Sequence, residues 1–387
     1  MTAMMWSREG TMSSSEFPIV DVERYGDIER KHREVARFLE AHDFEALLLR
    51  KPANFAWFTC GADSSRAGSS ERTAAVFITP EARVVAAGSI DASQLFEQEL
   101  AAMGFQLKER PWHEPRSLLL EDLSRGRRVA GDAPYHQVPE VSVHLTGLRI
   151  PLSPLECGRL REVGAIVAHA VEATCRSFTR GSTEAEVAGE LSHRIIKHGA
   201  VVERLQVFAD GRAGKYPHWS YGEQPIENWG TVAAVARKRG LCAAAARSVA
   251  FGRPAQDIVD AHHCATLVQA TGMFFSQPEW ELAEVWDRAQ RIYEKYGHPH
   301  EWQHAEQAEI IGYEPCELPV VPRSAFRLAP GMGVHWHPSV GPALVGDTIL
   351  VAEDDNQTIT AGANWPQLQL EIKGATIIRP AILRRGE

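Results

Sequence analysis

The stretch GMGVHWHPSVGPALVGDTILV, residues 331–351, has the pattern of two short strands joined by a turn. Its apolar residues alternate with small or polar ones up to Trp336, and Pro338 and Gly341 then interrupt the strand. A β-branched run follows at residues 347–351. Alternation with period two is typical of a strand with one buried face, and proline followed by glycine is typical of a turn. The pattern therefore predicts a strand, a turn and a second strand.

His335 and His337 lie two residues apart in the first of these strands. Successive side chains of a strand point to opposite faces, so both imidazoles share one face and Trp336 occupies the other. Two interpretations stay open at this point. The pair is either part of a half-exposed strand with surface histidines or part of a functional site.

The composition is typical of a soluble globular protein with two domains. The chain has 387 residues, of which 44% are hydrophobic and 24% charged, and its formal net charge is −9. Negative charge argues against a general nucleic-acid binder, because such proteins present positive charge to the phosphates. No apolar run has the length of a membrane span. Six scattered cysteines without a Cys-x-x-Cys pair indicate reduced thiols in a cytoplasmic protein.

The sequence pattern divides the chain into a tail and two domains. Residues 1–16 are rich in Ser, Met and Thr, lack the apolar core of a signal peptide, and are expected to be a disordered tail. Residues 17–150 alternate strand and helix patterns, which predicts a small α/β domain. Pro151 and Pro154 restrict the backbone to an extended link, so a second domain is expected at residues 151–387.

Hydrophobic periodicity predicts the elements of both domains. The cap-like residues Ser182, Thr183 and Glu184 open one of the helices. The expected helices cover residues 23–42, 93–103, 156–177, 184–198, 254–270 and 279–297. The expected strands cover residues 45–50, 73–78 and 83–87, and an Ala-rich β-pair is expected at residues 232–251.

The order Pro-Gly-Met, strand, Pro, turn and Gly-Asp-Thr-Ile-Leu-Val in residues 330–351 resembles the last part of the pita-bread fold of creatinase, prolidase and methionine aminopeptidase. The helices expected at residues 156–177 and 184–198 resemble the pair that opens that fold. The resemblance implies an α+β protein. A pita-bread C-terminal domain would be preceded by a smaller creatinase-type α/β N-terminal domain.

For the peptidases of this family, the resemblance implies a dinuclear metal site of two aspartates, one histidine and two glutamates. The matching positions in this sequence carry Ala236 or a neighbour, Ala244, Glu306, His337 and Gly346. Too few ligands remain for two ions, so the sequence predicts no metal and no cofactor. A gap would move His304 into the histidine position, and a mononuclear site from His304, His335 and His337 stays open.

Creatinase is the metal-free member of the family, and it hydrolyses a C–N bond with a histidine as general acid/base. The matching segment here is residues 215–222, in which His218 stands at the position of that histidine. An imidazole pKa of about 6.5 allows the group both to take and to give a proton at neutral pH. The alternative is an aromatic-rich loop in which His218 packs among Tyr216, Trp219 and Tyr221.

The charge at the expected pocket indicates the substrate class. The resemblance implies carboxylates around the guanidinium substrate of creatinase, whereas this chain has Ala246 and His337 at those positions. Arg247 is kept from the family motif. A neutral or anionic substrate is therefore expected.

The resemblance also implies a homodimer in which the loop at residues 61–72 reaches the neighbouring subunit's pocket. Arg66 or Arg72 would there hold a substrate carboxylate. The same Gly/Ser-rich loop is equally consistent with an ordinary surface loop.

The expected function is that of a metal-independent creatinase-like enzyme, a hydrolase or lyase that acts on a small neutral or anionic molecule by C–N hydrolysis or elimination. Two alternatives stay open: a catalytically inactive pita-bread protein that binds a ligand or protein, and a metallopeptidase of the Xaa-Pro type. The protein is expected in the cytoplasm, with no nucleic-acid or membrane partner. The candidate catalytic residues are His218, His337, Tyr313, Glu306 and His304, and the candidate substrate-binding residues are Arg247, Arg66, Arg72, His335 and Trp219.

Overall fold

The computed structural model describes residues 21–65, 73–362 and 364–386. Their backbone contacts divide them into two compact units. The first unit combines the described chain up to Leu48 with the described part of Ser64–Val129, and the second combines Leu49–Asp63 with the chain from Ala130 onward. The domain boundary that the sequence places at residue 150 stays a prediction.

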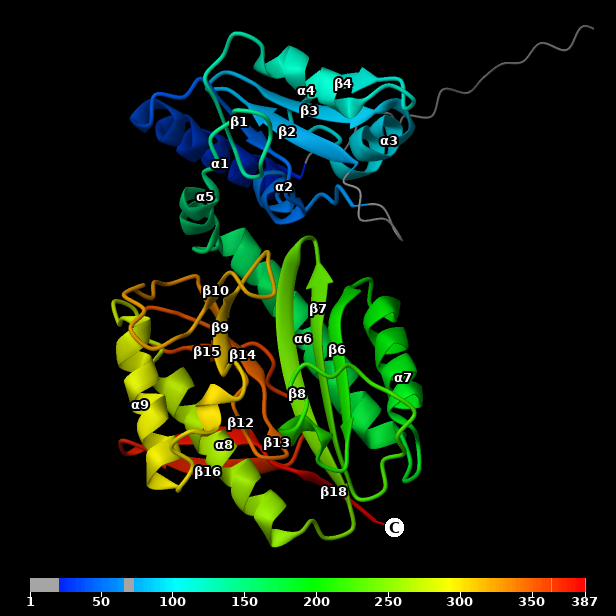
Figure 1. The fold of residues 1–387 in the computed structure, drawn as a ribbon, viewed down its shortest axis with the longest axis vertical. Helices are drawn as coiled ribbons and strands as arrows, with labels where there is room; N and C mark the ends of the chain where they lie inside the picture. The colour runs from blue at the N-terminus through cyan, green and yellow to red at the C-terminus, as the bar shows by residue number, and fades with distance from the viewer. Residues whose placement is uncertain (1–20, 66–72, 363, 387) are drawn as a thin grey trace, which may run out of the picture. The chain divides into compact units, whose positions relative to one another are not determined.

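A five-stranded sheet in the order β4-β3-β2-β1-β5 is the main feature of the N-terminal part (Figure 1). β2 and β3 form an antiparallel hairpin, and β3 pairs in parallel with β4. The strands are β1 (Ala46–Leu49), β2 (Ala74–Ile78), β3 (Arg83–Gly88), β4 (Gln106–Arg110) and β5 (Val129–Gly131), and the helices of the first unit are α1 (Val22–Ala41), α3 (Ser89–Gln94) and α4 (Arg116–Ser124).

One helix of this part differs from the sequence prediction. The helix expected at residues 93–103 begins at Ser89 and passes into a π-helical turn, Leu95–Glu99, in which Leu100 N donates to Leu95 O. The one large apolar residue of the first turn, Ile90, is 57% exposed and so is not part of the buried face of the helix. The apolar periodicity therefore indicates only the later part of the helix.

Two long helices and a four-stranded sheet form one half of the second unit (Figure 1). α6 and α7 both begin with a capping box, Ser153 with Glu156 and Thr183 with Glu186, so the predicted cap at Thr183 is confirmed. The sheet has the order β18-β8-β7-β6. The elements of this half are α6 (Pro154–Ser177), α7 (Glu184–Lys197), β6 (Val201–Ala209), β7 (Trp229–Lys238), β8 (Leu241–Phe251) and β18 (Leu383–Arg385). The short helices α2 (Pro52–Phe58) and α5 (Ser142–Arg149) also belong to the second unit.

The other half of the second unit contains two helices and a sheet of short strands in the order β10-β9-β11-β14-β15. β11 lies between β9 and β14 and pairs antiparallel with both. Among the described residues, no helix has both the length and the apolar character that crossing a bilayer requires. The elements are α8 (Gln256–Phe275), α9 (Leu282–Lys295), β9 (Ala308–Ile311), β10 (Leu318–Pro319), β11 (Gly333–Trp336), β12 (Ser339–Val340), β13 (Ala343–Leu344), β14 (Asp347–Leu350), β15 (Gln357–Thr358), β16 (Gln367–Ile372) and β17 (Ala375–Pro380).

The buried face of β11 packs against α8 through Trp336. This side chain is fully buried in the apolar cluster formed by α8, α9 and the neighbouring strands. Its ring lies so close to Gly272 that a Cβ atom there would be 2.5 Å from ring carbon Cε2. Its indole nitrogen donates to Ser276 Oγ at 3.1 Å. The strand therefore has a fixed orientation, with Trp336 in the core and His335 on the opposite face.

A buried histidine in α8 predicts a pH-dependent stability. His262 is 4% exposed, and burial, together with the charge of His263, lowers its pKa from 6.5 to about 4. Between pH 6.5 and about pH 4, His262 is protonated in the unfolded chain but not in the folded protein. The free energy of unfolding should thus fall by about 1.4 kcal/mol per pH unit as the pH drops from 6.5 to 4 because of this group.

Urea unfolding of the wild type and of His262→Gln across this pH range should show a flatter dependence in the variant. The exposed His193 supplies the control, because His193→Gln should keep the wild-type slope. Equal slopes for all three proteins would mean that His262 takes up its proton in the folded state.

Candidate functional site

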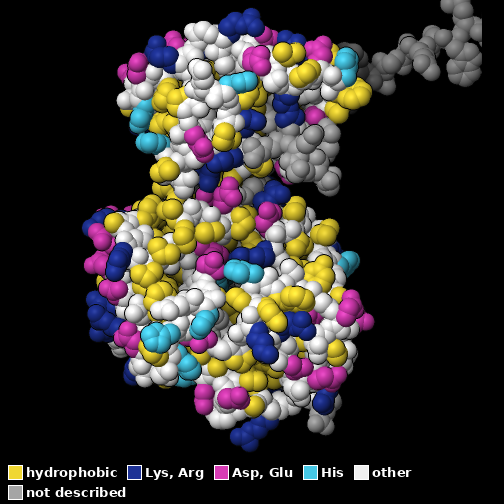
Figure 2. Space-filling model, viewed as in Figure 1, with side chains coloured by type: hydrophobic (Ala, Val, Ile, Leu, Met, Phe, Trp, Pro, Cys, Tyr) yellow, Lys and Arg dark blue, Asp and Glu magenta, His cyan; other side chains and the backbone are white. Residues whose placement is uncertain are grey.

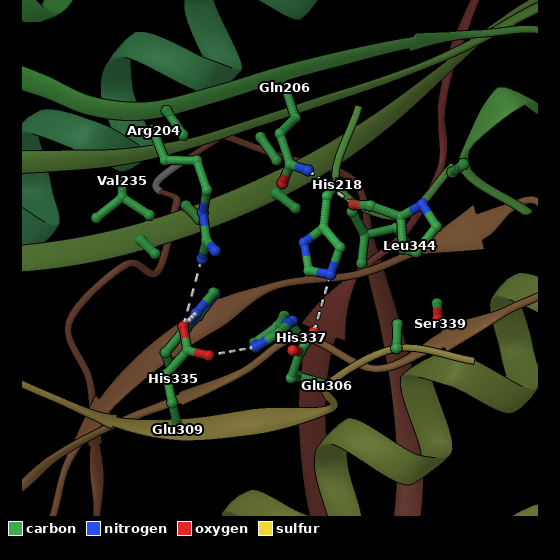
Figure 3. A pocket seen from close by; sticks show the side chains of 18 of the residues that line it. Arg204, Gln206, His218, Val235, Glu306, Glu309, His335, His337, Ser339 and Leu344 are labelled. Carbon is green, nitrogen blue, oxygen red and sulfur yellow. Dashed lines mark hydrogen bonds and ion pairs between the residues drawn. The ribbon is translucent and has the colours of Figure 1, made fainter. Parts of the chain in front are cut away.

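A cavity of about 150 Å³ lies in the second unit between the β6-β7-β8 sheet and the strands β9 and β11. On the face of this unit that Figure 2 shows, histidine, acidic and basic side chains gather near the middle, among apolar side chains. Figure 3 shows Arg204, His218, Glu306, Glu309 and His337 around the cavity. Two groups of polar residues can be distinguished, one buried and one near the mouth.

The buried group consists of one carboxylate between two imidazoles. Glu309 Oε1 lies 3.0 Å from His335 Nδ1, and Glu309 Oε2 lies 2.8 Å from His337 Nε2. The two imidazole rings stack with centroids 4.6 Å apart and an interplanar angle of 21°. Glu309 and His335 are 4% and 5% exposed. We call these three residues the Glu-His-His cluster.

The register of β9 and β11 creates this cluster. His335 is directly opposite Glu309 in the antiparallel ladder, so their side chains lie on the same face of the sheet. His337 follows two residues later, and its backbone N–H donates to Gln307 O at 2.8 Å, which continues the pairing beyond the end of β11. The prediction that both imidazoles share a face opposite Trp336 is confirmed.

The environment of the cluster favours an ionised glutamate and a neutral His335. Burial by itself would raise the pKa of Glu309, but the charges and hydrogen bonds of His337 and His335 hold it far below its usual range. Burial, followed by the charge of His337, lowers the pKa of His335 to about 4, against the opposing effect of Glu309. The Arg204 guanidinium lies 3.5 Å from Glu309 Oε1 and adds a positive charge beside the carboxylate.

The second group lies at the mouth of the cavity. His218 Nε2 is 3.4 Å from Glu306 Oε2, and their side chains are 69% and 58% exposed. The loop that carries His218 is anchored to β6, because Gln206 Nε2 donates to Pro217 O at 2.8 Å and to Trp219 O at 3.2 Å. His218 is therefore held at the cavity while its imidazole stays accessible.

The hairpin wall of the cavity carries methyl groups and no acidic side chain among the described residues that line it. The hairpin residues that line the cavity are Ala233, Ala234, Val235, Ala244, Ala245 and Ala246. Ala236, expected at or beside the first aspartate position, is offset by one residue from Val235 and points to the other face. Two divalent ions need several convergent carboxylates, so the residues that line this cavity do not fit a paired-metal centre.

The structure brings together only part of the predicted site. His218, Glu306, His335 and His337 all line the cavity. His304 is exposed and lies outside the lining. Trp219 also lies outside it, since its indole nitrogen donates to Glu184 Oε2 at 2.9 Å on the far side of the loop. Arg66 and Arg72 lie outside the described residues.

Two further predicted residues are buried away from the cavity. Tyr313 is 3% exposed, and its hydroxyl donates to Glu156 Oε1 at 2.6 Å. Arg247 is 2% exposed and is held between Glu172 Oε1 at 3.2 Å and Asp347 Oδ1 at 2.9 Å. The family motif placed Arg247 beside the pocket, but its side chain points from β8 toward α6 and β14. A role in substrate binding for either residue is therefore not supported by their contacts.

Among the described residues that line the cavity, Glu309 and Arg204 are the charged ones that sequence reasoning missed. Glu309 is a single acid in the otherwise apolar strand Ala308–Ile311. An acid in such a strand could have marked it as a candidate site residue. Its partners depend on pairing between strands that are 26 residues apart in the chain, which periodicity does not reveal. Arg204 lies in a strand of mixed polarity and carries no comparable signal.

Comparison with known proteins agrees with this architecture. Residues 158–361 match metallopeptidase family M24. The uncharacterized peptidase YqhT of Bacillus subtilis (strain 168) is 27% identical over 226 residues, which span 55% of this chain and 63% of that protein. The match thus covers less than two thirds of that relative.

Solved structures share the fold at low sequence identity. The Xaa-Pro dipeptidase from Bacillus anthracis has a TM-score of 0.71 at 17% identity and covers 94% of this chain and 99% of its own. The prolidase from Pyrococcus horikoshii OT3 has a TM-score of 0.74 at 18% identity, covering 86% and 98%. The N-terminal domain of FACT complex subunit SPT16 from Cicer arietinum (chickpea) has a TM-score of 0.68 at 12% identity, covering 88% and 97%. The predicted pita-bread fold with its smaller N-terminal domain is confirmed.

The position of Arg247 predicts a structural effect of its removal. Arg247→Ala would leave Glu172 and Asp347 buried without their shared cation. The free energy of unfolding should fall by about 3–5 kcal/mol, as measured by urea denaturation. Arg180→Ala is the control, because Arg180 pairs with Glu227 at the surface with both side chains about half exposed; it should cost at most about 1 kcal/mol. A stable Arg247→Ala protein would contradict the structural role.

Proposed function

Since this chain belongs to metallopeptidase family M24, we propose that it is a hydrolase that cleaves a C–N bond of a small neutral or anionic molecule without a paired-metal centre. Its substrate would occupy the cavity between β7, β8, β9 and β11. The observation that carries the proposal is the contrast between the two walls. The hairpin wall has methyl groups, and the facing side gathers the Glu-His-His cluster and the pair His218 and Glu306.

His218 is the proposed general acid/base. Its imidazole lies at the mouth of the cavity, accessible to water and substrate, and Glu306 is near enough to orient it. In hydrolysis His218 would take a proton from the attacking water as the C–O bond forms. It would return that proton to the leaving nitrogen as the C–N bond breaks, so the protons balance within the reaction.

The Glu-His-His cluster would position the substrate at the closed end of the cavity. An ionised Glu309 accepts hydrogen bonds, so the His337 nitrogen that faces it, Nε2, carries a proton. The other nitrogen of His337 can form a hydrogen bond with a substrate group or a water molecule. Arg204 is the cation that lines the cavity, and it would bind a substrate carboxylate or carbonyl.

The carboxylates of the cavity are already engaged. Glu309 contacts His335, His337 and Arg204, and Glu306 contacts His218. Sequence reasoning expected Glu306 at the site but not Glu309, and it sought the counter-charge for a cation only at Ala246 and His337. Because both acids have cationic or hydrogen-bonding partners, a cationic substrate still lacks a free counter-charge. This supports a neutral or anionic substrate.

A ligand-binding protein without catalysis is the second candidate function. The methyl groups of Ala233, Ala244 and Ala246, together with Gly346, are chemically inert and would suit such a role. Detection of any substrate turnover would separate the two candidates. The predicted homodimer remains a proposal for either of them.

The role of His218 gives a direct test. His218→Ala should lower kcat for any substrate found by about two to four orders of magnitude, because a general acid/base contributes that much. The unfolding midpoint should change little, because the side chain is 69% exposed. His193→Gln, at an exposed position on α7, is the control and should keep full activity. Unchanged kcat in His218→Ala with an intact fold would remove His218 from the mechanism.

The proposed charge preference predicts that creatine and other guanidinium compounds neither bind nor react. Isothermal titration with creatine should give no heat of binding, and incubation should release no urea. N-acetylglycine, a neutral amide with a carboxylate, is the matched probe and should bind more tightly in the wild type than in Arg204→Gln. Measurable creatine turnover would show that one of the two cavity carboxylates is free to bind a cation.

A further inference from the structure

The donor atoms of Glu309, His335 and His337 all lie within 4.8 Å of one another. We propose that these three residues bind one divalent transition-metal ion, with zinc the ion best suited to the set. Two imidazoles and one carboxylate are a recurrent ligand set for catalytic zinc. The proposal concerns binding of the ion and does not depend on the reaction proposed above.

Two of the donor distances within the cluster are slightly shorter than those of such a site, and the whole set lies within 4.8 Å. Tetrahedral zinc with bonds of about 2.0–2.2 Å holds its donor atoms about 3.3–3.6 Å apart. Glu309 Oε1 and His335 Nδ1 are 3.0 Å apart, and Glu309 Oε2 and His337 Nε2 are 2.8 Å apart. The two contacts use different oxygens of Glu309, so a bound ion would replace both hydrogen bonds by metal bonds to the two imidazoles and the carboxylate.

The cluster is also built on rigid elements and has one open side. Glu309 and His335 are paired across the β9–β11 ladder, and both are buried. The side toward the cavity of about 150 Å³ is open, so a water molecule or a substrate oxygen could complete the coordination. Three protein ligands with one open position are typical of catalytic rather than structural zinc, where the ion acts as a Lewis acid.

This site differs from the paired-metal centre that the family resemblance implies. Of its three ligands, only His337 stands at a family ligand position, and Glu309 and His335 do not. The methyl groups on β7 and β8 offer no carboxylate for a second ion. It also differs from the mononuclear set left open by the sequence, because the exposed His304 lies outside the cluster and Glu309 takes its place.

Metal content of the purified full chain tests the proposal. The protein is stripped with a chelator, incubated with Zn²⁺, desalted and analysed for bound metal by mass spectrometry, and its affinity is measured by titration. The wild type should hold one zinc ion per chain. Glu309→Gln preserves the side-chain shape, and His337→Ala removes a half-buried ligand; each should weaken binding at least about 100-fold, since even loss of an outer-shell partner costs about 10- to 100-fold.

His304→Ala is the matched control, because it removes an exposed histidine from the same segment and should still hold one ion. Co²⁺ in place of Zn²⁺ should give the visible absorption bands of four- or five-coordinate cobalt in the wild type and in His304→Ala, but not in the cluster variants. Far-UV circular dichroism would verify that the variants fold.

Three outcomes would overturn the proposal. Two ions per chain would indicate a paired centre, and no bound ion would leave the cluster a purely hydrogen-bonded one. Loss of the ion in His304→Ala, with retention in Glu309→Gln, would favour the histidine-only set. A protein that binds one ion but shows no hydrolytic activity would support the site and contradict the proposed function, so the two can fail separately.

Discussion

The site depends on β11 having one face, with Trp336, in the apolar core and the other, with His335, at the cavity. The antiparallel pairing of this strand with both β9 and β14 leaves no freedom of register, because a shift by one residue would exchange its two faces. Trp336 could then no longer fill the space against Gly272, where a larger residue than glycine has no room. The packing of one aromatic ring in the core thus places His335 opposite Glu309 on the other face. Core and site are two consequences of the same register.

A second constraint joins the two halves of the C-terminal unit. Arg247 on β8 contacts Glu172 on α6 and Asp347 on β14, and it donates to Thr360 O at 2.8 Å. The residues that precede Arg247 and Asp347 are also in contact, because Ala246 N donates to Gly346 O at 2.9 Å. A Cβ atom at Gly346 would come within 3.3 Å of His335 Nε2. The hairpin and β14 are therefore held against each other at the floor of the cavity, which keeps the cavity small.

The chemistry of the cavity follows from what each wall contributes. The hairpin provides methyl groups, which add no charge. The polar groups are concentrated on the facing strands and on the loop that carries His218. Low polarity on one side strengthens electrostatic interactions on the other, because the local dielectric constant is reduced. The Glu-His-His cluster is accordingly a strongly coupled group of charges and hydrogen bonds.

The sequence by itself determined the fold and the face on which the histidines lie. Period-two alternation through residues 331–337 placed His335 and His337 together opposite Trp336, and capping residues marked the long helices, because these signals are local. The structure alone decided which residues meet. Glu309 joins the histidines through cross-strand pairing, Arg204 enters from β6, and Arg247 and Tyr313 turn away into buried contacts. Such partners depend on register and packing between distant segments, and a local pattern contains no information about them.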